Sequence, residues 1–106
     1  MNNKQIITDE DVEKAVDFLI NTAEKAAKYK AERIYLTEYR KSLKALLMKD
    51  NLDLPISAQE REAYASPVYI SHLDGLRSAI ERDEKQRFLR IAAEAKIEAW
   101  RSMSAN

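Results

Sequence analysis

The chain has 106 residues, with one Gly, two Pro and no Cys, and its 18 basic and 18 acidic residues give a formal charge of zero. This length is typical of one domain, and the scarcity of Gly and Pro beside abundant Ala, Leu, Glu, Lys and Arg predicts an all-α fold. Without Cys there is no disulfide, thiolate nucleophile or cysteine metal site, and zero net charge gives no chain-wide attraction to nucleic acid or anionic lipid.

Membrane association is not expected from the hydropathy pattern. No apolar run approaches the roughly 20 residues that span a bilayer, and the N-terminus is polar where a secretory signal needs an apolar core. We therefore expect a cytoplasmic protein with no membrane partner.

The first predicted helix runs from about residue 9 to about residue 49. Thr8 precedes Asp9, Glu10 and Asp11, which is typical of a helix N-cap followed by an acidic first turn. No Gly or Pro interrupts the chain until Pro55, and the Asp, Asn and Pro residues around 50–57 predict a loop.

Two further helices complete a single helical domain over residues 1–106. Ser57 and Glu60 match a capping box, which predicts a short helix over about 58–65. Ser66 and Pro67 match an N-cap and first helical position, which predicts a last helix from about 67 to about 102. A long, a short and a long helix favour an antiparallel hairpin. Antiparallel pairing sets Leu43 near Leu73, Leu36 near Ile80 and Val16 near Trp100.

The apolar stripe of each long helix changes side along the chain. In the first helix the change falls near residue 28. Its two stripes are Val12, Val16, Leu19, Ile20, Ala23 and Ala27, and then Tyr29, Leu36, Tyr39, Leu43, Leu46 and Leu47. In the last helix the charged run at 81–87 interrupts the stripe. Its residues are Tyr69, Leu73, Leu76 and Ile80, and then Phe88, Ile91, Ala92, Ala95 and Ala99.

A slender hairpin with this pattern leaves apolar surface uncovered near its C-terminal end. Phe88, Leu89, Ile97 and Trp100 are the candidate interface residues, and we expect a homodimer that forms a four-helix bundle. The alternative is that the first helix bends or breaks near residues 28–30 and folds back on itself.

A basic block at residues 25–49, with eight Lys or Arg against two Glu, lies between two acidic stretches. Five of its cations fall within about 100° on a helical wheel. These candidate nucleic-acid-binding residues are Lys30, Arg33, Arg40, Lys41 and Lys44. Such a stripe can follow phosphates, but it is equally typical of a solvated face or a protein-binding surface. Tyr29 and Tyr39 belong to the apolar stripe, so base stacking beside these cations is poorly supported.

Catalytic and cofactor motifs are absent. His72 has no carboxylate at helical spacing, and the pairs Glu81 with Glu84 and Glu94 with Glu98 lack the accompanying His of carboxylate metal sites. Gly75 lies within a helix rather than in a phosphate-binding loop, and it favours the close approach of another helix. We expect no enzyme activity, metal or cofactor.

Three segments, "ERIYLTEYRKSLKALLM", "AQEREAYASPVY" and "DEKQRFLRIAAEAKIEAWR", resemble a family of small proteins of tailed bacteriophages and prophages. The resemblance covers residues 12–101. It depends on Tyr35, Glu38, Tyr39, Arg40, Ser42 and Lys44, on Glu60 to Ala65, and on Glu94 to Arg101. It implies a place among phage replication and recombination functions in the host bacterial cytoplasm, and no particular chemistry.

Two functional hypotheses follow. The first is a non-catalytic, dimeric helical adaptor that binds a phage or host DNA-processing protein. The second is a protein that binds DNA or RNA directly through the basic stripe.

Overall fold

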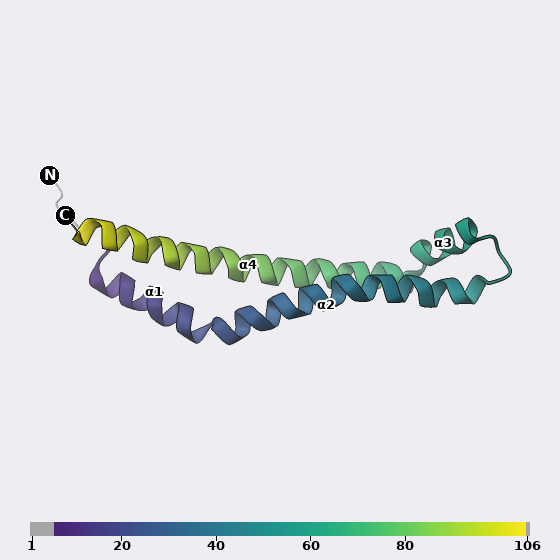
Figure 1. Cartoon of the computed structure of the whole chain (residues 1–106), viewed down its shortest axis with the longest axis horizontal. Helices are drawn as coiled ribbons and strands as arrows, with labels where there is room; N and C mark the ends of the chain where they lie inside the picture. The colour runs from purple at the N-terminus through teal and green to yellow at the C-terminus, as the bar shows by residue number, and fades with distance from the viewer. Residues whose placement is uncertain (1–5, 106) are drawn as a thin grey trace. The chain divides into compact units, whose positions relative to one another are not determined.

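The computed structural model describes residues 6–105, and helices are its only regular elements there. They are α1 (Asp9–Asn21), α2 (Ala23–Met48), the short 3₁₀ helix η1 (Lys49–Asn51), α3 (Ile56–Ala65) and α4 (Pro67–Ser104), as Figure 1 shows. The predicted all-α helical hairpin is confirmed. Residues 1–5 and 106 of the expected domain lie outside the described residues. No helix within the described part of the chain is both long and apolar enough to cross a membrane.

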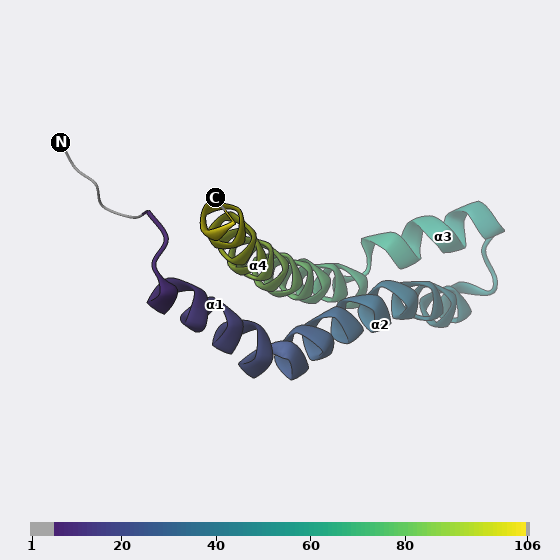
Figure 2. The same cartoon turned by 60° about the vertical axis from the view of Figure 1, so that its left-hand side comes forward.

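The described residues divide into two compact units. The terminal unit comprises residues 6–28 and 84–105, and the hairpin unit comprises Tyr29–Asp83. Both α2 and α4 therefore contribute residues to each unit. In the hairpin unit, α2 and α4 lie side by side and α3 folds back beside the end of α2 (Figures 1 and 2).

The start of α1 confirms the predicted cap. The Thr8 hydroxyl accepts a hydrogen bond from the Asp11 amide at 3.1 Å, and the Asp11 carboxylate accepts one from the Thr8 amide at 3.0 Å. These reciprocal bonds satisfy two backbone amides that have no partner within the helix.

The single helix expected from 9 to 49 is instead interrupted at Thr22. The Thr22 backbone departs from helical values (φ −107°, ψ 4°), and its hydroxyl donates to the Phe18 carbonyl at 2.6 Å. Arg90 of α4 donates to the Leu19 carbonyl at 3.1 Å and to the Thr22 hydroxyl oxygen at 2.9 Å. The Phe18 carbonyl also accepts the Thr22 amide at 3.0 Å, so the Arg90 side chain supplies a donor for the Leu19 carbonyl at a break that contains no Gly or Pro.

The capping box predicted at Ser57 is wrong. Helix α3 begins at Ile56, with Pro55 as its N-cap and no side-chain cap. Glu60 does not reach back to the helix start but pairs with Lys44 of α2 at 3.7 Å. The Gln59 amide instead donates to the Leu54 carbonyl at 2.8 Å. Glu60 therefore contacts Lys44 of α2 in place of the Ser57 backbone amide expected from the capping box.

The start of α4 agrees with the sequence. Ser66 is extended, and its hydroxyl accepts a hydrogen bond from the Val68 amide at 3.2 Å. Pro67 occupies the first helical position, where its missing amide costs no hydrogen bond.

The buried face of α4 continues straight through the charged run. Its buried or half-buried positions, apart from Glu84 and Ala99, are alternately three and four residues apart, which is a heptad pattern. They are Tyr69, His72, Leu76, Ala79, Asp83, Gln86, Arg90, Ala93, Ile97 and Trp100. Leu73 and Ile80, expected on this face, are exposed beside it. The predicted interruption of the stripe at 81–87 is wrong. Charged residues are expected to be exposed, but Asp83 is buried and Arg90 is half-buried, each beside a partner.

The face buried by α1 and α2 also keeps its side, contrary to the switch expected near residue 28. Its positions follow the same spacing, with exposed Arg40 as the exception. They are Ala15, Leu19, Thr22, Ala26, Tyr29, Arg33, Leu36, Leu43 and Leu47. Small and polar members of this face, such as Ala26 and Arg33, have low hydropathy. The stripes predicted from apolar residues therefore fell on neighbouring positions and missed part of the buried face.

Candidate functional site

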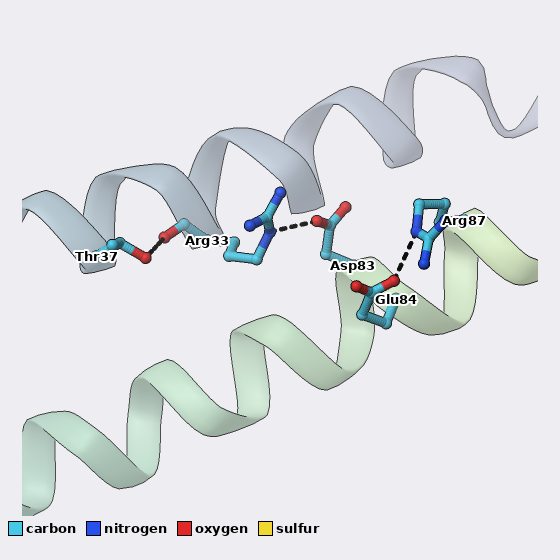
Figure 3. A network of polar contacts seen from close by, with 5 residues as sticks. All are labelled: Arg33, Thr37, Asp83, Glu84 and Arg87. Atoms are coloured by element: carbon cyan, nitrogen blue, oxygen red, sulfur yellow. Dashed lines mark hydrogen bonds and ion pairs between the residues drawn. The ribbon is translucent and has the colours of Figure 1, made fainter.

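The five cations of the predicted basic stripe do not share one surface. Arg33 turns toward α4, where its Nε donates to Asp83 Oδ2 at 2.5 Å (Figure 3). The Arg33 side chain is 36% exposed and that of Asp83 is 13% exposed. Arg33 is therefore a structural residue of the seam between α2 and α4, and it does not belong to an exposed basic stripe.

Lys44 is covered by α3. Its ammonium lies 3.7 Å from Glu60 and 4.9 Å from the centre of the Tyr64 ring, and Tyr64 packs edge-on against Tyr69 of α4. Contact with Tyr64 and the negative charge of Glu60 raise the pKa of Lys44 above its ordinary value. Glu60 and Tyr64 are spaced four apart on one face of α3, which is the signal that could have predicted this cover.

Two of the three remaining cations, Arg40 and Lys41, line a hollow at one flank of the hairpin unit. Arg40 and Lys41 are exposed, and Lys41 pairs with Glu38 at 3.6 Å. The hollow measures about 650 Å³ and is lined by Arg40, Lys41, Lys44, Ala45, Met48, Tyr64 and Tyr69. Lys30 is exposed, lies nearly three turns before Arg40 and does not line the hollow. This arrangement can hold an anionic group beside an aromatic ring.

The four candidate interface residues also divide into two pairs. Ile97 and Trp100 lie on the half-buried face of α4, and Trp100 Nε1 donates to Asp9 Oδ1 of α1 at 2.8 Å. They stabilise the terminal unit. Phe88 and Leu89 remain exposed, and Leu89 lines a shallow hollow with Phe18 between α1 and α4.

An exposed apolar face lies on the opposite side of α4 from its buried seam. We call Phe88, Ile91, Ala92 and Ala95 the outer α4 face; all four are exposed, with Phe88 at 59% and Ile91 at 46%. The guanidinium of Arg87 lies 4.7 Å from the Phe88 ring centre and is held by Glu84 at 2.6 Å (Figure 3). These residues formed part of the packing stripe predicted from the sequence, and in the structure all four are exposed, with Ala92 at the edge of the hollow that Leu89 and Phe18 line.

His72 and the glutamate pairs take structural contacts. His72 Nε2 donates to the Leu36 carbonyl at 2.9 Å, and its ring packs against Tyr39 with centres 5.5 Å apart. Glu84 pairs with Arg87 and Glu98 with Arg101. Across residues 6–105, no group of three or more His, Asp or Glu side chains is close enough to hold a metal ion.

Comparison of the chain with protein-family models, curated proteins and solved structures gives no match.

Proposed function

We propose that this protein is a non-catalytic accessory protein that acts by binding another protein through the outer α4 face. The observation that carries the proposal is the exposure of Phe88 and Ile91 on one helix face beside Ala92 and Ala95. Two large apolar anchors next to small residues fit a helix docked along α4 or a groove that accepts α4.

Arg87 supports the same assignment. Aromatic residues and arginines are enriched among the residues that dominate binding energy at protein interfaces. Arg87 lies against the Phe88 ring and pairs with Glu84, and these contacts restrict the rotamers of both side chains before a partner arrives. Ordered anchors lose less side-chain entropy on binding than mobile ones.

The partner that we propose is a phage or host DNA-processing protein in the host bacterial cytoplasm. This context comes from the resemblance of three segments to small phage proteins. The protein in this proposal uses no metal or cofactor, because its contribution is a binding surface.

The proposal is tested by a binding comparison with a matched control. The tagged full chain is expressed in infected host cells, and a recovered partner is purified and titrated by calorimetry. Truncation of one interface anchor costs about 2 kcal/mol, which is about 30-fold in Kd, so the double variant Phe88→Ser with Ile91→Ser should raise the Kd by more than about 30-fold. Ile20→Ser, at an equally exposed apolar position on α1, should leave it unchanged. A partner that binds the double variant as tightly as the wild type would exclude the outer α4 face.

A second candidate function is nucleic-acid binding at the hollow of Arg40, Lys41 and Tyr64. Two exposed cations beside an aromatic ring can hold a phosphate and a base of a single strand. Affinity should then fall with salt, with a logarithmic slope of about −0.7 per phosphate contacted. Arg40→Glu with Lys41→Glu should abolish binding, whereas Lys30→Glu outside the hollow should affect it less. Absence of binding to single- and double-stranded DNA at about 50 mM salt would end this candidate.

A further inference from the structure

A second exposed surface lies on the hairpin unit, along one flank of the seam between α2 and α4. We call it the tyrosine–glycine face: Tyr35, Tyr39 and Leu46 on α2, and Ser71, Gly75 and Ser78 on α4. All six residues are exposed. None is charged, although 34% of the chain is Asp, Glu, Lys or Arg.

An ion pair shows that the two halves of this face lie on the same flank. Glu32 of α2 and Arg82 of α4 meet across the seam at 2.9 Å. Tyr39 follows Glu32 by seven residues and Gly75 precedes Arg82 by seven, so each occupies the same side of its helix two turns further along. Because the helices are antiparallel, Tyr39 and Gly75 lie at the same level. The contact of Tyr39 with His72 agrees with this register.

The α2 half of the face is bulky. The rings of Tyr35 and Tyr39 are stacked with centres 6.1 Å apart and an interplanar angle of 9°. Tyr35 is 66% exposed and Leu46 is 51% exposed. Helix α3 contacts Lys44, which lies on the other flank of the seam, and so leaves this face open.

The α4 half of the face is small. A Cβ atom placed on Gly75 would have no neighbour within 4 Å. The sequence predicted that Gly75 admits the close approach of another helix, and none of the helices over residues 6–105 makes that approach. Ser71 and Ser78 flank Gly75 on the same side of α4, so a hollow strip of backbone faces outward.

We propose that a second copy of this chain docks on the tyrosine–glycine face and forms a four-helix bundle of two hairpin units. A two-fold axis parallel to the helices lays α2 of each copy on α4 of the other. The stacked tyrosines of one copy then fill the strip around Gly75 of the other. The two-fold axis generates this contact twice in the dimer. The face carries both the bulky and the small half of the contact, as an isologous interface requires.

Charge complementarity supports this pairing. In the same arrangement Glu32 of one copy lies level with Arg82 of the other. Each carboxylate then stands between two guanidinium groups, and both side chains are 44% exposed and so have room for a second contact. The homodimer expected from the sequence is thus placed on the hairpin unit rather than on Phe88, Leu89, Ile97 and Trp100. This inference does not rest on the proposed partner at the outer α4 face.

The test is the mass in solution of the full chain and of matched variants, measured by light scattering and sedimentation equilibrium. The wild type should have the mass of two 12.2 kDa chains at concentrations above a Kd of about 1 µM. Gly75→Leu should raise the dimer Kd at least tenfold, and Tyr35→Glu should do the same. Ala45→Leu, at an exposed small position of α2 that lines the hollow on the other flank, should leave the Kd unchanged.

Folding of each variant is checked by circular dichroism. The Gly75→Leu side chain enters open space in a single chain, so the monomer should remain helical with a Tm no lower than that of the Ala45→Leu monomer. A wild-type monomer at about 100 µM would overturn the proposal. So would a dimer that survives both Gly75→Leu and Tyr35→Glu, or one that dissociates only with Phe88→Ser and Ile91→Ser.

Discussion

Replacing Asp83 with Ala removes the carboxylate that holds Arg33 in the seam between α2 and α4. Breaking a buried ion pair costs about 3–5 kcal/mol because the remaining charge is left without a partner, whereas an exposed pair is worth about 0–1 kcal/mol. The Asp83 side chain is 13% exposed, but Arg33 at 36% can turn part of its guanidinium to water. We therefore expect a loss of about 1–3 kcal/mol, between the two limits.

The control is the neighbouring pair of Glu32 and Arg82, whose side chains are both 44% exposed. Glu32→Ala should cost no more than about 1 kcal/mol. Urea unfolding followed by far-UV circular dichroism, at a chain concentration below the dimer Kd, measures both losses in the monomer, and double-mutant cycles give the coupling within each pair. Arg33→Leu with Asp83→Leu should be neutral or stabilising, because the seam then holds two apolar side chains.

Two results would refute this reasoning. One is an Asp83→Ala variant that loses no more stability than Glu32→Ala. The other is a coupling between Arg33 and Asp83 below about 0.5 kcal/mol, within the error expected for independent sites. Either would mean that Asp83 tolerates burial without its ion pair.

Three further predictions concern single side chains. Gln86 Nε2 is buried without a hydrogen-bond partner, so Gln86→Leu should raise the free energy of unfolding by about 1–3 kcal/mol in a urea titration. Arg90→Met leaves the Leu19 carbonyl without its side-chain donor, and it should cost about 1–3 kcal/mol and speed amide exchange around the helix break. The Thr8 amide, and then its hydroxyl, lower the pKa of Asp11 below its ordinary 3.8. The cap therefore stabilises the fold above that pH and is lost as pH falls through the lowered value; Thr8→Ala should return the pKa toward 3.8 in an NMR titration.

The helix starts at Thr8 and at Ser66 with Pro67 were predictable because capping is local. A side-chain oxygen and an amide two or three residues away meet in almost any fold that contains the helix. The same logic failed at Ser57, where Glu60 was needed for the local cap. In the folded chain Glu60 instead meets Lys44, sixteen residues earlier, and no local pattern contains that contact.

The basic stripe was also overestimated because tertiary contacts are not visible in the sequence. A helical wheel placed Arg33 and Lys44 on one side correctly as backbone positions. Long side chains reach away from those positions, and Arg33 reaches Asp83 while Lys44 reaches Glu60. Only Arg40 and Lys41 remain available near the hollow, so charge clustering in the sequence overstated the free basic surface.

The amino-acid sequence alone determines that this chain is helical, because Gly and Pro are scarce and helix-forming residues are abundant, and it marks two of the helix starts through their caps. Tertiary contacts decide which side of each helix is buried and where the first helix breaks. Burial of Asp83 depends on Arg33, fifty residues away, and the break at Thr22 depends on Arg90 of α4. Hydropathy ranks such residues as exposed because it measures the free energy of an isolated charge, whereas a charge with a partner across the seam can leave water at much lower cost.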